Sequence, residues 1–290
     1  MKKLLSVVLA SAMLFGGVIT ASAEEVVDLP REETLYFGGQ QWGTVNSWNP
    51  IGVNQNNAMA TTAQLLGSRT LMFETLYMYN FLDGSLTPLL ADGDYQWNDD
   101  LTELTIKLKD AAKWSDGTDV TSADVIRTFD IGVEIGNGVG TGYGAYIDSI
   151  EAIDDKTFVI KAAVTEEGKP VNPLKVNDFL GGVFIAQAAW IDTCVERNGG
   201  DATKILADDG RDAPYSGPYG FYFDNDQLVA LIRNDAYWGQ DESMWGKLPA
   251  PKYQAHTIYS GNDASLVAFR EGQIDVNQQF ASNIQDMWEK

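Results

Sequence analysis

The sequence predicts an α/β fold, because strand-like and helix-like patterns follow one another along its 290 residues. From Leu104 to Lys109 apolar and polar residues alternate, which is typical of a half-buried strand. A turn at residues 115–117 follows, and apolar residues at helical spacing begin at Val125. Later in the chain, residues 263–276 read as an amphipathic helix, a glycine stop and a strand.

The helix that follows the turn at residues 115–117 has a recognisable start. Thr121 and Asp124 form a T-x-x-D capping box, in which the hydroxyl caps a free backbone N–H and the carboxylate reaches back. Gly117 supplies the positive φ of the preceding turn, because it lacks the Cβ that resists this conformation. We therefore expect a strand, a tight turn and a capped helix, with Trp114 held at the junction.

Other segments extend the alternation of strands and helices. A glycine-rich run at residues 135–144 lacks any phosphate-binding glycine motif, so it is interpreted as a flexible loop. Further strands are predicted at 33–37, 228–233 and 253–259, and 95–97 is predicted to pair with 104–109 as a hairpin. Residues 71–79 read as the end of a helix that passes into a short strand, and residues 146–161 read as a strand, an Asp-rich turn and a second strand.

Composition excludes several classes of function. The formal net charge of −21 repels nucleic acid and anionic lipid. Cys194 is the single cysteine and His256 the single histidine, so the sequence offers no internal disulfide and no zinc-type ligand spacing. A Ser-His-Asp triad would have to use His256, and the sequence has no G-x-S-x-G motif for the nucleophile. Paired carboxylates carry little information among 41 acidic residues. No cofactor or metal is predicted.

The first residues have the pattern of a secretory signal peptide. Met1-Lys2-Lys3 precedes an apolar run, and Ala21-Ser22-Ala23 provides an A-x-A cleavage site. We expect residues 1–23 to be removed after Ala23. No cysteine lies at the end of the apolar run, where a lipidated cysteine would stand, so lipidation is not expected and the protein is predicted to be periplasmic or secreted.

A long motif identifies a family. The run KWSDGTDVTSADVIRTF at residues 113–129 resembles the signature of family 5 extracellular solute-binding proteins. Three later runs resemble the same family in order: YSGPYGFY at 215–222, RNDAYWG at 233–239 and LPAPKY at 248–253. The resemblance covers residues 33 to 280. It implies a ligand-capturing component of an ABC importer, with a two-lobed periplasmic-binding-protein-like α/β fold of the large type that carries an extra domain.

The resemblance also implies how the chain is divided. Residues 24–80 correspond to the first segment of lobe I, residues 81–212 to a small inserted α/β domain, and residues 213–290 to the second segment of lobe I. Family members are close to twice this length. The chain is therefore expected to be an amino-terminal fragment in which the second lobe is largely missing.

Candidate ligand-binding residues follow from the edge at which such sheets bind ligands. Ligands of open α/β sheets sit beyond the carboxyl ends of the strands. Gln40, Gln41 and Trp42 directly follow the first predicted strand, and Trp48 fits either ligand contact or packing beside Asn49. The remaining candidates come from later matches to the family: Trp190, Tyr219, Asn277 and Phe280.

The expected ligand is an oligosaccharide of the cello-oligosaccharide kind, because the sequence pattern at residues 38–50, directly after the first strand, resembles that of the cellobiose-binding branch. An oligopeptide is the alternative, and a secreted carbohydrate-active enzyme or lectin is a remote one. The family performs no catalysis, so the protein is not expected to be an enzyme. The implied partners are ABC permease subunits with their ATPase, and the protein is expected to be a monomer that closes around its solute.

Overall fold

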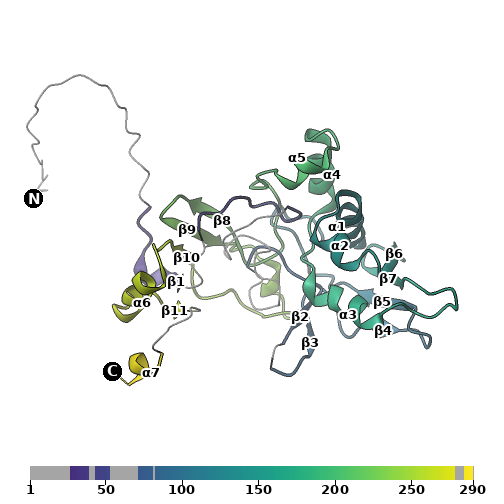
Figure 1. The fold of residues 1–290 in the computed structure, drawn as a ribbon, viewed down its shortest axis with the longest axis horizontal. Helices are drawn as coiled ribbons and strands as arrows, with labels where there is room; N and C mark the ends of the chain where they lie inside the picture. Colours follow the sequence, from purple (N-terminus) through teal and green to yellow (C-terminus); the bar gives the residue numbers. More distant parts are fainter. Residues whose placement is uncertain (1–26, 39–42, 53–70, 81, 278–283, 290) are drawn as a thin grey trace, which may run out of the picture.

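The computed structural model describes residues 27–38, 43–52, 71–80, 82–277 and 284–289. Within them, strands form one five-stranded, one four-stranded and one two-stranded sheet. Figure 1 shows the two larger sheets at opposite ends of the molecule, with the two-stranded hairpin between them. In this part of the chain, no helix is both long and apolar enough to cross a lipid bilayer.

The five-stranded sheet joins segments that are far apart in the sequence. Its order is β11-β1-β10-β9-β8, and β1 runs parallel to both β10 and β11. The strands predicted at 33–37, 228–233 and 253–259 are all confirmed here. The members are β1 (Thr34–Gly38), β8 (Tyr219–Asp224), β9 (Leu228–Arg233), β10 (Tyr253–Thr257) and β11 (Val276–Asn277).

The two faces of this sheet are covered differently. Val229 and Leu231 of β9 point into the main hydrophobic core, whereas Ala230 between them belongs to a small second cluster with Leu29. This alternation follows from the period of two along a strand. Helix α6 (Asn262–Arg270) lies against the second face at the end of β1, so that a Cβ on Gly38 would come within 3.3 Å of the Ser265 Oγ.

The four-stranded sheet is built from one continuous part of the chain. Its order is β4-β5-β7-β6, and every neighbouring pair is antiparallel. The hairpin predicted between 95–97 and 104–109 is confirmed as β4 paired with β5. The members are β4 (Gln96–Trp97), β5 (Glu103–Lys107), β6 (Ile147–Ala152) and β7 (Thr157–Ala162). The division into lobe I segments and an inserted domain stays a prediction.

The strand, turn and capped helix after β5 are confirmed. Gly117 has a φ of 88° in the turn, and helix α1 (Ser122–Ile135) begins after Thr121 with the capping box formed. The Asp124 carboxylate accepts hydrogen bonds from the Thr121 backbone N at 2.8 Å and from the Trp114 indole at 3.2 Å. Trp114 is thus buried at the junction, as expected.

The glycine-rich segment after α1 is a helix, so its prediction as a flexible loop is wrong. Helix α2 (Gly138–Tyr143) starts at Asn137, whose side-chain oxygen accepts from the Val139 backbone N at 2.8 Å. The two helices approach closely, since a Cβ on Gly140 would lie 2.1 Å from the carbonyl oxygen of Gly132. Glycine, which weakens an isolated helix, is here required by helix packing.

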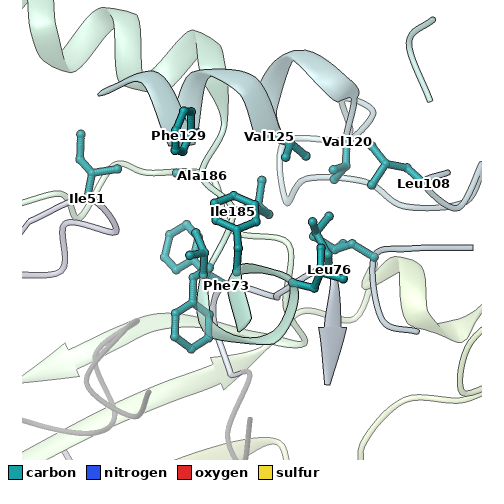
Figure 2. Close-up of a cluster of buried hydrophobic side chains, with 14 of the residues drawn as sticks. Ile51, Phe73, Leu76, Leu108, Val120, Val125, Phe129, Ile185 and Ala186 are labelled. Atoms are coloured by element: carbon teal, nitrogen blue, oxygen red, sulfur yellow. The ribbon is translucent and has the colours of Figure 1, made fainter. Parts of the chain in front are cut away.

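A continuous core connects the two ends of the molecule. Figure 2 shows Phe73 and Leu76 from the central segment packed beneath Val125 and Phe129 of α1, with Ile185 between them. The other elements are η1 (Arg31–Glu33), β2 (Tyr77–Tyr79), β3 (Leu86–Pro88), α3 (Pro173–Gly182), α4 (Ala188–Arg197), α5 (Ala202–Leu206), η2 (Trp238–Gln240) and α7 (Ile284–Trp288).

Candidate functional site

The carboxyl ends of the parallel strands meet at one edge of the five-stranded sheet. Gly38 at the end of β1 pairs with Asn277 of β11, and Phe37 pairs with His256, so Thr257 at the end of β10 lies at the same level. Ligands of open α/β sheets bind beyond this kind of edge. We call the ends of these three strands, Gly38, Thr257 and Asn277, the carboxyl edge.

Asn277 presents an unused acceptor at the carboxyl edge. Its side-chain Oδ1 is buried and has no hydrogen-bond partner in the described part of the chain, and the same holds for Ser265 Oγ on the helix beside Gly38. A buried polar group without a partner costs about 1–3 kcal/mol. A solute that donates a hydrogen bond to Asn277 would therefore bind with an advantage, because it satisfies an acceptor that the protein leaves unpaired.

A shallow hollow of about 360 Å³ lies beside the carboxyl edge. One wall is held by an ion pair between Arg31 and Asp275, and the Arg31 guanidinium lies 5.3 Å from the centre of the Tyr36 ring. Burial alone would raise the pKa of Asp275, but the hydrogen bonds from Arg31 and from the Tyr36 backbone outweigh it and lower that pKa. The lining residues are Arg31, Tyr36, Thr257, Tyr259, Gly272 and Gln273.

Trp48 packs inside the protein. Its side chain is 0% exposed, its indole N donates to the Asp224 carboxylate at 3.4 Å, and its ring meets Phe221 edge-on at 4.9 Å. Of the two interpretations of the sequence, the structure therefore favours packing, since no face of the ring is open to a solute. Gln40, Gln41, Trp42 and Phe280 lie outside the described residues.

Trp190 and Tyr219 are also buried and lie away from the carboxyl edge. The Trp190 indole N donates to Asp212 at 3.0 Å and only 5% of the residue is exposed. Tyr219 is 1% exposed and its hydroxyl donates to the Pro251 carbonyl at 2.7 Å. Tyr219 starts β8 at the end of the sheet opposite to Asn277, because β8 and β9 run antiparallel there. Both side chains have structural contacts in this arrangement.

One buried carboxyl group, that of Glu74, was not predicted from the sequence. Glu74 is 1% exposed, and burial raises its pKa to about 8 although Tyr237, Trp238 and Ser216 donate hydrogen bonds. One signal was available, because Glu74 is the single charged residue in the apolar run 71–79. The charge of Lys109 has the smallest of the effects that lower this pKa, so burial dominates and the carboxyl is held mainly in its neutral form at neutral pH.

The described residues contain no group of three or more His, Cys, Asp and Glu that could hold a metal ion. His256, the single histidine, is buried in β10. The acceptors and backbone of the carboxyl edge are suited to binding a polar solute through hydrogen bonds.

Curated relatives share a part of their length with this chain. A protein described as the probable peptide-binding protein YejA of Agrobacterium fabrum is 28% identical over 204 residues, which are 67% of this chain and 30% of that protein. An uncharacterised protein of Sinorhizobium fredii, y4wM, is 25% identical over 238 residues, or 81% of this chain and 33% of that protein. The chain thus spans about a third of the length of these relatives.

Solved structures share the fold. A periplasmic oligopeptide-binding protein of an ABC transporter from Thermotoga maritima, with mannohexaose bound, has a TM-score of 0.71 at 21% identity, and the match covers 89% of this chain and 43% of that one. NikZ from Campylobacter jejuni, in complex with Ni(L-His), has a TM-score of 0.64 at 16% identity over 90% of this chain and 46% of that one. The expected periplasmic-binding-protein-like α/β fold is therefore confirmed.

The family assignment rests on a match that covers most of the chain. Residues 85–290 match the model of the bacterial extracellular solute-binding proteins, family 5 Middle. The family is one of binding proteins, so the expectation that the chain is not an enzyme follows from membership. The match does not distinguish a cellobiose-binding branch. The chain belongs to the family 5 bacterial extracellular solute-binding proteins.

Proposed function

We propose that this chain forms one wall of the ligand cleft of an ABC importer's solute-binding protein, and that the carboxyl edge contacts the solute. The observation that carries this proposal is the buried, unpaired Oδ1 of Asn277 beside Gly38 at the ends of parallel strands. Gly38 lets the Ile274 and Ser265 side chains approach the backbone of this edge closely. Family membership supports the same role.

The solute is an oligosaccharide in this proposal. Sugar hydroxyls donate hydrogen bonds without carrying charge, which suits an amide oxygen with no ionised partner. Gln40, Gln41 and Trp42 follow β1 directly in the sequence, and two amides with an aromatic ring are suited to hydroxyl patterns and sugar faces. The mannohexaose bound to the Thermotoga maritima protein is consistent with a sugar in this fold.

An oligopeptide is the second candidate. It is favoured by the description of the Agrobacterium fabrum relative as a probable peptide-binding protein. Peptide N–H groups would also donate to the Asn277 oxygen. In either case the proposed partners are permease subunits with their ATPase, which receive the solute outside the cell membrane after two lobes close around it.

Calorimetric titration of the chain with cello- and manno-oligosaccharides and with tri- to pentapeptides tests the proposal. We expect saturable heat with a sugar, and Asn277→Ala should weaken that binding about tenfold, the loss of one well-placed hydrogen bond in a dry site. Gln96→Ala removes an exposed amide in the four-stranded sheet and serves as the control.

Two results decide between the candidates. Saturable binding of peptides alone would replace the oligosaccharide by the oligopeptide. Binding of neither class, or binding that Asn277→Ala leaves as strong as Gln96→Ala does, would refute the carboxyl edge as the ligand-binding wall.

A further inference from the structure

A cavity of about 720 Å³ lies in the other half of the molecule, between the β2–β3 hairpin and helix α3. This volume is within the usual range for small-molecule sites. Figure 1 shows the hairpin and α3 well away from β1 and β11, so the cavity is separate from the carboxyl edge. It is lined by Tyr79, Gly84, Ser85, Leu86, Asp94, Tyr95, Leu174, Asn177, Asp178, Gly181 and Gly182.

The charge of the lining is negative. Asp94 and Asp178 contribute two carboxylates, and no Lys, Arg or His is among the lining residues. Lys175, on the neighbouring turn of α3, binds Asp178 at 2.5 Å. Asp94 makes no hydrogen bond or ion pair with any residue of the described part of the chain. One carboxylate at the cavity is therefore available to a cation.

The end of a helix adds to this negative potential. Gly181 and Gly182 are the last residues of α3, and the last turn of that helix carries no basic residue. The unpaired carbonyl groups at a helix C-terminus carry partial negative charge and favour cations. Gly181 also keeps the helix end close to the hairpin, because a Cβ there would lie 3.0 Å from Leu86 Cδ2.

The remaining walls are aromatic and apolar. Tyr79 and Tyr95 bring two rings, and Tyr95 is fixed edge-on to Tyr77 with 5.6 Å between the ring centres. Ring faces attract cations, and Leu86 and Leu174 offer surface to a hydrocarbon stem. A neutral polyol would gain nothing from the negative potential, and an anion would be repelled.

We propose that this cavity is a second binding site, which takes an organic cation: an amine or guanidinium group on a hydrocarbon stem. The cationic end pairs with Asp94 near the C-terminus of α3, and the stem lies against the tyrosine and leucine side chains. The cation class follows from three independent features, namely the unpaired carboxylate, the uncompensated helix end and the lack of any basic lining residue.

The indole N–H of Trp97 provides a local probe. It donates at 3.1 Å to Asn177, which lines the cavity, so an occupant should move its signal in a ¹H–¹⁵N spectrum of the whole chain. Trp97→Phe assigns the signal. Titration with spermidine is expected to shift it saturably, while the indole of Trp238, bound to Glu74 elsewhere, stays unchanged. 1,8-Octanediol and glutarate, a neutral stem and an anion, should produce no saturable shift.

Matched variants test the role of charge. Asp94→Asn should weaken spermidine binding at least about tenfold, as expected for a lost hydrogen bond to a charged group. Asp100→Asn removes a carboxylate that is also exposed, from the β4–β5 turn, and should leave the affinity unchanged. Binding should also weaken as salt is raised.

The outcomes that overturn the proposal are distinct. Equal binding of 1,8-octanediol and spermidine would make the site one for neutral chains. Equal affinities of the Asp94→Asn and Asp100→Asn proteins would refute the pairing of the cation with Asp94. A Trp97 signal that spermidine does not move would refute the cavity as its binding site. An unchanged Trp238 signal confirms in each variant that the fold is intact.

Discussion

The Glu74 carboxyl accepts a hydrogen bond from the Trp238 indole at 2.9 Å, although the two residues are 164 positions apart in the chain. The Tyr237 hydroxyl donates to the other carboxyl oxygen. These bonds join the segment before β2 to η2, which follows β9. Because the carboxyl is fully buried, its protonation is linked to folding.

Glu74→Gln should change how stability depends on pH. Burial raises the pKa of Glu74 to about 8 from the ordinary value of 4.5, so the folded protein keeps its proton through a range in which the unfolded chain has lost it. Between these values the unfolded state binds fewer protons, and the wild-type free energy of unfolding falls as pH rises. The contribution is complete below about pH 4.5 and lost above about pH 8.

Urea unfolding at several pH values between 5 and 8 would check this. The stability of Glu74→Gln relative to wild type should rise with pH by up to about 1.4 kcal/mol per unit. Glu103→Gln, an exposed change in β5, is the control for general charge effects. A Glu74→Gln difference that stays constant over this range would contradict the prediction.

Asp124→Ala should destabilise the protein by about 3 kcal/mol, because it removes a helix cap and leaves buried donors unpaired. The carboxylate accepts from Thr121, from Trp114 and, at 2.7 Å, from the Ala188 backbone N at the start of α4. Chemical unfolding measures the loss. Asp130→Ala removes an exposed carboxylate from the same helix, and a loss of the same size there would assign the effect to net charge.

Gly140→Ala should cost about 1–3 kcal/mol, the usual penalty of overpacking. Its Cβ would clash with the Gly132 carbonyl oxygen at 2.1 Å, so α2 would have to move away from α1. Gly142→Ala, in the same helix with no atom within 4 Å of the new Cβ, should instead be neutral or stabilising by about 0.5–1 kcal/mol. Thermal unfolding of both variants decides: equal effects would mean that the two helices are not held by this close approach.

Trp42→Ala should weaken binding of the cognate sugar by about 1–3 kcal/mol, within the range for an aromatic contact at a binding site. Trp245→Ala removes a tryptophan that is 50% exposed after η2 and should leave the affinity unchanged. Calorimetry with the sugar identified in the panel provides the measurement. If the Trp42 variant binds as tightly as wild type, Trp42 does not contact the ligand.

The parts of the fold that were predictable depend on local chemistry. The turn at Gly117 and the cap formed by Thr121 and Asp124 are specified within a dozen residues, so the sequence was sufficient to predict them. The helix at Gly138–Tyr143 was not predictable in this way. Its glycines serve a contact with Gly132, and a pattern of residues does not reveal which backbone another helix will approach.

The candidate site shows the same limit. Parallel strands and their order placed Asn277 at the end of a strand, as the resemblance implied. The orientation of Trp48 depends instead on Asp224 and Phe221, which come from a strand far along the chain. An aromatic residue in a loop has the same sequence pattern whether its ring faces solvent or core. Only the packing in the structure therefore distinguishes the two interpretations of Trp48.

The position of β1 between β10 and β11 has a consequence for the order of assembly. Thr34 pairs with Tyr253, and Gly38 pairs with Asn277, so β1 has no neighbouring strand in its sheet until more than 200 further residues have been made. The four-stranded sheet draws all its strands from Gln96 to Ala162 and closes much shorter loops. Low sequence separation favours early folding. The carboxyl edge is thus expected to form after the four-stranded sheet in a newly synthesised molecule.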